Sequence, residues 1–305
     1  MADTLVSVVI PCYRQAHFLP QAVESVLAQT HTYHEIIVID DGSPDHAREV
    51  VAAYPGVSYH FQENRGLAAA RNSGLQETRG EYVVFLDADD RLLPTALAAG
   101  VTGLSARPEC AFVWGFHRPI DGRGNLLPSE PRSFSGGAGY AQLLRANVVG
   151  SPMGVMFRRS AVVAVGGFSR TVRYVEDYDL YLRLSRNHAN YCHGELIAEY
   201  RYHDANMSAD CPGMLRGVLR ALDEQTSWVG NDSALRQALQ EGRRWAWERY
   251  DGEPRVQRLR EHLRGKRWLP ATACTATLLV KYPRMFFQVM ARRAKRALSP
   301  SSEHL

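Results

Sequence analysis

Short apolar segments alternate with helical patterns through the first half of this chain. The apolar segments cover residues 6–11, 35–40, 57–61 and 81–86. Between them, apolar positions recur three and four residues apart, which is typical of amphipathic helices. Strands that are apolar almost throughout belong to parallel sheets buried on both faces. The pattern therefore predicts an α/β fold with a doubly wound, mainly parallel sheet and right-handed connections.

The elements predicted after Pro94 are more varied. A helix comes first, and the residues DGRGN (121–125) then read as the turn of a hairpin between two extended pieces. Residues 128–139 have the composition of a loop. Three further elements are expected: a strand at 151–160, a helix at 175–187, and a strand followed by a loop at 193–208.

The pattern changes beyond Pro212, where Arg-rich helical segments continue to the end of the chain. Breaks between these helices are expected near Gly230, Pro254 and Pro270, since Gly and Pro interrupt helices. We therefore expect two parts. One is a domain over residues 1–212, and the other is a basic, mostly helical extension over residues 213–305.

Charge is distributed unevenly along the chain. The net charge is +4, yet 16 Lys and Arg face only 6 Asp and Glu from residue 236 onward. A basic extension on a mildly acidic body indicates an anionic surface as a partner, and a solvated tail is the alternative. The apolar stretch at 268–280 is too short to cross a bilayer. The sequence predicts that the extension lies on a membrane without spanning it.

Interfacial side chains accompany the basic cluster at residues 292–296. They are Trp268, Tyr282, Phe286, Phe287 and Met290. Tryptophan and other apolar side chains beside basic residues suit a membrane interface. The alternative is that they dock the extension onto the rest of the chain. The first residues read as a strand and not as a signal peptide, and the five cysteines form no C-x-x-C pair. We expect a cytoplasmic protein, peripheral on the inner face of the cell membrane.

Carboxylates gather where three of the predicted strands end. The first strand ends in PCYR (11–14), the second in DDGS (40–43) and the fourth in DADD (87–90). Ligands of open α/β sheets bind beyond the carboxyl ends of the strands. Asp, Gly and Ser also form turns and helix caps, which is the plainer explanation for DDGS. For DADD it is weaker, because one cap needs only one Asp.

Asp87 and Asp89 are two residues apart in an extended segment and therefore point the same way, with the small Ala88 turned aside. Two carboxylates with no Cys or His near them in sequence suit Mn²⁺ or Mg²⁺. Such ions complete their shell with water and phosphate oxygens, which points to a nucleoside diphosphate ligand. The sequence contains neither a P-loop nor a G-x-G-x-x-G after the first strand.

Six segments together resemble the glycosyltransferases of family 2. They are VSVVIPCYRQAHFLPQAVESVLAQT, EIIVIDDGSPD, ENRGLAAARNSG, GEYVVFLDADD, VEDYDLYLRL and YRYHDANMS. The resemblance covers about residues 5–208. It implies a GT-A fold and a hexosyltransferase-like enzyme that moves a sugar, with inversion, from a nucleotide donor to a hydroxyl. It also implies that a D-x-D motif holds the metal.

The resemblance assigns roles to the residues at the strand ends. Those expected to bind the donor are Pro11, Tyr13 and Arg14 around the nucleoside, Asp41 at the base with Asp40 beside it, Asp87 at the ribose, and Ala88. Asp89 would coordinate the metal, whereas Asp90 is expected to cap or support. Arg71 either binds the donor or pairs with a surface acid.

The catalytic base implied by the resemblance is Asp177, in VEDYDLYLRL. Helical spacing places Asp177, Leu180, Tyr181 and Leu184 on one buried face. The helix dipole near the N-terminus is expected to keep Asp177 ionised, as a base requires. A simple helix-terminal Asp is the alternative.

Three neighbouring residues receive weaker assignments. Glu176 would orient Asp177 or the sugar. Asp179 is expected to form a surface pair with Arg183, four residues on. His203, in YRYHDANMS, is expected either to approach the metal or to serve as a structural hydrogen-bonding residue.

The predicted partners follow from the same resemblance. They are a nucleotide sugar, UDP- or GDP-linked, and an acceptor glycan or lipid-linked sugar, with no nucleic acid. The segment QEGRRW (240–245) has one residue too many for the Q-x-x-R-W block of processive synthases. The rival function is a non-catalytic nucleotide-sugar-binding or scaffold module of a polysaccharide assembly complex. A nucleotidyltransferase would need a Gly-rich phosphate loop, which PCYRQAHF is not.

Overall fold

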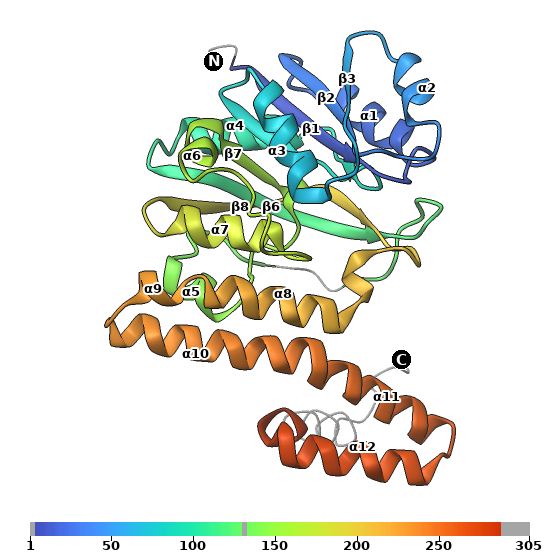
Figure 1. Ribbon diagram of the computed structural model, residues 1–305, viewed down its shortest axis with the longest axis vertical. Helices are drawn as coiled ribbons and strands as arrows, with labels where there is room; N and C mark the ends of the chain where they lie inside the picture. Colours follow the sequence, from blue (N-terminus) through green and yellow to red (C-terminus); the bar gives the residue numbers. More distant parts are fainter. Residues whose placement is uncertain (1–3, 130–132, 288–305) are drawn as a thin grey trace, which may run out of the picture.

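The computed structural model describes residues 4–129 and 133–287, and one eight-stranded sheet organises it (Figure 1). The strand order is β3-β2-β1-β4-β7-β6-β8-β5. The strands are β1 (Val6–Cys12), β2 (His34–Asp40), β3 (Val57–Phe61), β4 (Tyr82–Phe85), β5 (Arg91–Leu92), β6 (Cys110–Ile120), β7 (Val155–Arg158) and β8 (Ala189–Arg201).

The four strands predicted from the first half of the sequence are all present and parallel. Beyond β4 the sheet becomes mixed, because β7 runs antiparallel to both of its neighbours, β4 and β6. β6 and β8 are again parallel, and the short β5 pairs antiparallel to β8. The predicted α/β fold class is confirmed, and the antiparallel strand β7 is the feature that the alternation pattern did not reveal.

Two hydrophobic cores cover the two faces of the sheet. One packs α1 (Leu19–Leu27), α2 (Ala47–Ala52) and α4 (Ala96–Ser105) against residues such as Val8 and Ile10 of β1. The other packs α3 (Leu67–Glu77) and α7 (Glu176–Ser185) against residues such as Val9. Alternate residues of β1 thus face opposite cores, as the period of a strand requires. This arrangement explains why the strand is apolar almost throughout.

Two local expectations need correction. Residues 121–125 form the expected tight turn, with Asp121 N donating to the Asn125 carbonyl, but only the single bridge Ile120–Leu126 follows it and no second strand forms. In addition, β3 is an edge strand, and its Phe61 is exposed, so it is not buried on both faces. An edge strand has a neighbour on one side only, which leaves part of its surface in water.

The C-terminal helices divide into two groups. The first comprises α8 (Cys211–Asp223), α9 (Thr226–Val229) and α10 (Ser233–Trp247), whose buried residues join the core beneath α7. Of the short helices of the preceding region, α5 (Tyr140–Arg145) packs on α10, whereas α6 (Arg159–Ala164) packs against β7 and α7. The predicted boundary at residue 212 stays a prediction, and the packing adds that α8 to α10 share the core of the sheet.

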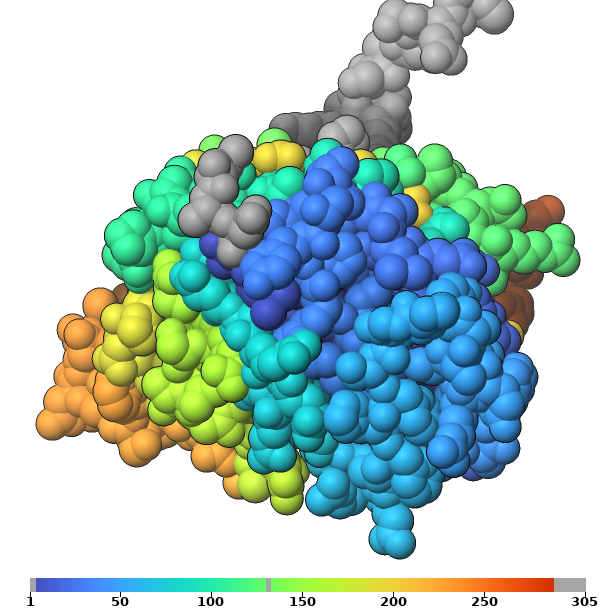
Figure 2. All heavy atoms as spheres, turned by 90° about the horizontal axis from the view of Figure 1, so that it is seen from above, coloured from blue at the N-terminus to red at the C-terminus, as the bar shows by residue number. Residues whose placement is uncertain are grey.

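The second group is a helical pair, α11 (Glu253–Arg264) and α12 (Trp268–Lys281), with a small core of its own around Val256, Leu278 and Tyr282. It lies at one end of the molecule, beyond α10 (Figure 1). Seen from above, residues of the first half make up most of the visible face, with yellow-green residues of the second half beside them, and the C-terminal helices emerge at its margin (Figure 2). Met290 and the basic cluster 292–296 fall outside the described residues.

The predicted helix break near Pro254 is wrong, whereas the break near Gly230 is confirmed. A π-helical turn, η3 (Glu248–Gly252), connects α10 to α11 without interruption, and Pro254 lies in the first turn of α11. Proline is tolerated there, since the first N–H groups of a helix have no intrahelical partner. Pro270 likewise lies in the first turn of α12. None of the helices in the described part of the chain is long and apolar enough to cross a membrane.

The packing of α10 on α5 generates a stability prediction. A Cβ at Gly242 would lie 1.9 Å from the Leu144 carbonyl oxygen, so Gly242→Ala forces the two helices apart. We expect a loss of ~1–3 kcal/mol, in the range of overpacking, in one cooperative thermal transition. Gly139→Ala is the matched control, because its φ is −62° and no atom lies within 4 Å. Equal melting temperatures for both variants would contradict the shared core.

Candidate active site

The ends of β1, β2 and β4 bring the three polar segments together. Cys12 at the end of β1 is in register with Asp40 of β2, and Val9 is in register with Phe85 of β4. The chain therefore leaves the sheet at one edge in all three places. This is the crevice where open α/β sheets bind ligands.

A buried ion pair occupies the centre of this crevice. Arg71 Nη2 of α3 lies 2.6 Å from Asp87 Oδ1, and the Arg71 side chain is only 3% exposed. Of the two roles expected for Arg71, pairing with an acid is therefore the one observed, but its partner is the first carboxylate of the D-x-D segment. Burial lowers the pKa of this guanidinium, yet Asp87, Asp177 and Glu176 outweigh it and the net pKa is raised. Arg71 is thus held as a cation among three carboxylates.

Asp177 begins α7 beside this cation. Its Oδ1 accepts a hydrogen bond of 2.8 Å from the backbone N–H of Tyr178. Burial raises the pKa of Asp177 to about 7, although Arg71 opposes the shift. The net shift is upward, opposite to the expectation based on the helix dipole, because desolvation exceeds the favourable charges. A carboxylate that titrates near neutrality is suited to general-base chemistry.

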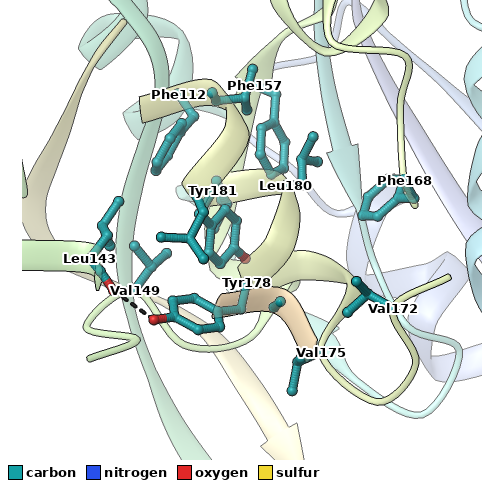
Figure 3. Packing of buried hydrophobic residues seen from close by; sticks show 14 of the residues in the cluster. Phe112, Leu143, Val149, Phe157, Phe168, Val172, Val175, Tyr178, Leu180 and Tyr181 are labelled. Carbon is teal, nitrogen blue, oxygen red and sulfur yellow. Dashed lines mark hydrogen bonds between the residues drawn. The ribbon is translucent and has the colours of Figure 1, made fainter. Parts of the chain in front are cut away.

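Glu176, next to Asp177, is itself buried in this crevice. Burial raises the pKa of Glu176 as well, and Arg71 again opposes the shift. Three members of the predicted shared face, Leu180, Tyr181 and Leu184, are fully buried, whereas Asp177 at its start is half-buried. Figure 3 shows Leu180 and Tyr181 packed among the buried aromatic and aliphatic side chains around α7.

Asp89 and His203 are in direct contact with each other. His203 Nε2 lies 2.8 Å from Asp89 Oδ2, and Gln15 Nε2 donates to the same oxygen at 2.8 Å. Burial, and then the charge of Asp87, raise the pKa of Asp89. The structure thus places the two predicted metal ligands in direct contact, one from the loop after β4 and one from the loop after β8.

The donors present fit a hard divalent cation. Asp89 offers carboxylate oxygen and His203 offers an imidazole nitrogen, with the carboxylate of Asp87 near enough to interact electrostatically with Asp89. Mn²⁺ accepts such oxygen and nitrogen donors. No group of three or more His, Cys, Asp or Glu side chains suited to a metal occurs within residues 4–129 and 133–287. A cation here would therefore need further ligands from its substrate, as Mg²⁺ and Mn²⁺ commonly do.

Asp90 has the supporting role that was expected, because it binds backbone next to the site. It is 1% exposed, and its Oδ1 accepts a hydrogen bond from the backbone N–H of Arg201 at 2.8 Å. The fully buried Arg201 side chain donates to the Asp89 carbonyl at 2.6 Å and to Gln21 at 2.7 Å. Arg201 therefore fixes the backbone of Asp89. Sequence reasoning missed it, although it lies two residues before His203 in a segment that carried the resemblance.

Asp41 organises the loop after β3. Its two carboxylate oxygens accept hydrogen bonds from the Gln62 side chain and from the backbone N–H groups of Arg65 and Gly66. Gly42 has φ +72°, and a Cβ there would lie 2.8 Å from Asn64 N, so this close approach requires glycine. The observed role of Asp41 is to shape the loop, and its predicted contact with the base remains a prediction.

The other predicted donor residues line the same edge. Tyr13 is exposed, and the Arg14 guanidinium lies 5.2 Å from its ring centroid. Arg14 has φ +58°, an uncommon conformation for a residue other than glycine, and its N–H donates to Ser43 Oγ. Pro11 and Ala88 are buried. The exposed ring of Tyr13 offers a flat surface on which a nucleobase can stack.

A loop missed by the sequence analysis closes the crevice beside Arg71. The Asn72 side chain exchanges two hydrogen bonds of 2.8 Å with the backbone of Phe168, and the Phe168 ring centroid lies 5.3 Å from the Arg71 guanidinium. Arg183 donates to the carbonyls of Val165 and Gly167. These contacts hold Phe168 over the cation. The block ENRGLAAARNSG contained Asn72, but only the fold reveals its partner 96 residues away.

Asp179 and Arg183 form the predicted ion pair, but the prediction that it lies on the surface is wrong. The two side chains are 2.8 Å apart, but Asp179 is 2% exposed and Arg183 is 16% exposed. The pair is buried because Arg183 also anchors the loop that ends in Phe168. It therefore supports the site instead of facing water.

Comparison with known proteins identifies the family. The family model described as "Glycosyl transferase family 2" matches residues 7–166, more than half of the chain. The chain belongs to glycosyl transferase family 2. It is a glycosyltransferase.

Curated relatives agree with this family. An uncharacterized glycosyltransferase of Rickettsia typhi is 28% identical over 72% of this chain and 73% of its own length. Chondroitin synthase of Escherichia coli is 32% identical over 59% of this chain, but only 26% of that protein is covered. A Bacillus subtilis glycosyltransferase named for teichuronic acid biosynthesis is 29% identical over 68% of this chain and 82% of its own length.

Solved structures confirm the GT-A fold. TarS 1–349 of S. aureus, solved in complex with UDP-GlcNAc, has a TM-score of 0.65 at 16% identity, over 81% of this chain and 74% of that one. The mannosyltransferase PcManGT of Pyrobaculum calidifontis, in complex with GDP-Man and Mn²⁺, has a TM-score of 0.63 at 18% identity, over 97% and 81%. At such identities the likeness supports the fold and not a particular substrate.

The raised pKa of Asp177 generates a prediction about stability. The folded chain binds this proton more tightly than the unfolded chain, so the stability contributed by Asp177 falls as pH rises from about 4 through about 7. Asn cannot ionise. Asp177→Asn should therefore unfold at higher denaturant concentration than the wild type at pH 8, by ~2 kcal/mol after allowance for solvent screening. The gain should vanish near pH 4. A variant less stable at pH 8 would contradict the buried, destabilised carboxylate.

Proposed function

We propose that this enzyme is an inverting, metal-dependent glycosyltransferase that moves a sugar from a nucleoside diphosphate to an acceptor hydroxyl. The observation that carries the proposal is the Arg71 cluster, in which one buried guanidinium interacts with both Asp87 and Asp177. Donor-binding and base groups are thereby joined in one site. Direct displacement with inversion needs a base on the acceptor side and charge stabilisation on the leaving-group side.

On the donor side, the nucleoside would lie against Pro11, Tyr13 and Arg14, with Asp87 directed to the ribose. Asp89 and His203 would hold Mn²⁺ or Mg²⁺, which supplies positive charge for the diphosphate. Relatives with the same fold were solved with UDP-GlcNAc and with GDP-Man and Mn²⁺. A UDP- or GDP-linked sugar is therefore the proposed donor.

On the acceptor side, Asp177 would take the proton of the attacking hydroxyl through its carboxylate. With a pKa of about 7, the carboxylate is partly ionised at neutral pH and is basic enough to accept the proton. Two curated relatives are named for chondroitin synthesis and teichuronic acid biosynthesis. We infer an acceptor in polysaccharide or glycolipid assembly, either a glycan or a lipid-linked sugar.

A lipid-linked acceptor would give membrane proximity a purpose, and α12 has the surface for it. No charged residue occurs between Trp268 and Val280, and its outer face carries Leu269, Ala273, Ala276 and Val280 at helical spacing. Leu269 is 85% exposed and Val280 is 82% exposed. An exposed helix face of this kind, without charge, favours an apolar environment.

Basic residues surround this apolar face at both of its ends. Arg264, Lys266 and Arg267 precede α12, Lys281 is its last residue and Arg284 follows it, and all five are exposed. Lys281 and Arg284 also line a groove of about 590 Å³ with Arg244, Trp247, Glu248, Tyr282 and Pro283. Basic residues at a bilayer surface attract anionic lipid headgroups. We therefore propose that the enzyme works peripherally, on the cytosolic face of an anionic membrane.

The donor assignment predicts the effect of removing Asp89. Asp89→Ala should abolish Mn²⁺-dependent binding of UDP or GDP, because the carboxylate that would coordinate the cation is lost, while the melting temperature of the free protein stays within a few degrees. Binding is measured by calorimetry with and without Mn²⁺, after a screen of nucleotide sugars by thermal shift. Asp204→Ala, an exposed carboxylate next to His203, is the control that keeps binding. Unchanged metal dependence in Asp89→Ala would refute the assignment.

The membrane assignment predicts the effect of charging the α12 face. The double variant Leu269→Glu, Val280→Glu should lose cosedimentation with vesicles rich in anionic lipid, whereas wild-type binding should rise with anionic lipid and weaken with salt. The matched control is Leu27→Glu, Val163→Glu, an equally charged pair at exposed positions elsewhere, each 51% exposed. The proposal would be refuted if all three proteins were recovered equally with the vesicles, or if none of them bound.

A further inference from the structure

Two buried polar atoms beside the proposed base have no hydrogen-bond partner. Seven buried side-chain nitrogen and oxygen atoms are unpaired in the described part of the chain, and Arg71 Nε and Tyr181 Oη are two of them. A buried hydroxyl without a partner has lost its hydrogen bonds to water and gained none in return, so it calls for an explanation. Both atoms belong to side chains that interact electrostatically with Asp177.

Helix geometry directs the Tyr181 hydroxyl toward the start of α7. Tyr181 lies four residues after Asp177, and helical side chains lean toward the N-terminus, over the residue four positions earlier. Figure 3 shows the Tyr181 hydroxyl on the side of Tyr178 and Val175, at the beginning of the helix. Its ring is fixed by stacking on Phe112 and Phe157, at centroid distances of 5.4 Å and 6.1 Å.

Asp177 has the capacity to accept this hydroxyl. Its Oδ1 already accepts from Tyr178 N, while no hydrogen bond to its other oxygen occurs among the described residues. Tyr178 is itself anchored, because its hydroxyl donates to the Leu143 carbonyl at 2.6 Å. One side of the carboxylate is therefore fixed by the backbone. In free enzymes, catalytic hydrogen bonds are often long and tighten only when substrate binds.

We propose that Tyr181 is a positioning residue for Asp177: its hydroxyl donates to the carboxylate in the working enzyme and orients the oxygen that meets the acceptor. This inference rests on the proposed function of Asp177 as the base. Phe112, Phe157 and the helix hold the phenol in place, so the carboxylate is the group that moves to make the contact. The acceptor proton is transferred to Asp177, and Tyr181 keeps its own proton throughout.

The charged and titratable groups facing Asp177 come from four elements. They are Arg71 of α3, Asp87 after β4, Glu176 and Tyr181 of α7, and Tyr250 of η3. Tyr181→Phe removes one hydroxyl and leaves the others in place. Loss of a donor to the ionised form disfavours that form, so the pKa of Asp177 should rise. Burial and the charge of Asp177 raise the pKa of Tyr181 itself, which keeps it a donor at neutral pH.

The experiment compares Tyr181→Phe with the wild type by carbon-13 NMR of the Asp177 carboxyl, assigned with Asp177→Asn, with Mn²⁺ and the nucleoside diphosphate selected by the thermal-shift screen bound. We expect the midpoint of its titration to move up by about one pH unit. The acidic limb of kcat should move by the same amount, while the Kd of the donor stays within twofold. Tyr178→Phe is the matched control on the same helix, since it loses the bond to Leu143 and should leave the Asp177 midpoint in place.

The outcomes separate this inference from the proposed function. An unchanged Asp177 midpoint in Tyr181→Phe overturns the inference, and the hydroxyl is then only an unsatisfied group whose removal leaves stability equal or higher. A midpoint that moves without any change in the pH profile of kcat upholds the contact, but it refutes Asp177 as the base. The NMR measurement needs no activity, so the first result stands whatever the second shows.

Discussion

The buried cation Arg71 is the constraint on which the rest of the site depends. It is 3% exposed and interacts with three carboxylates, Asp87, Glu176 and Asp177, that come from two separate segments of the chain. Removing a buried partner of this kind costs about 3–5 kcal/mol, because the remaining charges are left uncompensated. The segment after β4 and helix α7 can therefore fold against each other only with this guanidinium between them.

The scaffold around Arg71 serves to hold it there. Asn72, next to it in α3, fixes the backbone of Phe168, and Arg183 of α7 ties the same loop from the other side. Burial that raises the pKa of Asp177 to about 7 destabilises the folded chain with Asp177 ionised, but it suits the proposed base to neutral pH. Such an exchange of stability for reactivity is expected at active sites. Long-range side-chain contacts, and not the strand ends alone, thus set the chemistry.

The sequence predicted the parallel half of the sheet and most strand-end residues because both depend on local patterns. Apolar runs mark buried strands, and Asp89 and His203 came from motifs that the fold then brought within 2.8 Å. The rest depends on tertiary contacts. No local signal distinguishes a buried pair such as Asp179 and Arg183 from a surface one, or shows that desolvation outweighs the helix dipole at Asp177. The antiparallel direction of β7 was not predicted for the same reason, because the path of the chain sets the direction of a strand.

We propose that Asp177, paired electrostatically with Arg71, removes the acceptor proton in a site that binds the donor independently. The most direct test is single-turnover transfer by Asp177→Asn at saturating nucleotide sugar and Mn²⁺, with donor affinity measured on the same preparation. The account predicts an unchanged donor Kd and a rate lower by about 10²–10⁴-fold, the usual contribution of general-base catalysis. Transfer at the wild-type rate with intact donor binding would contradict it.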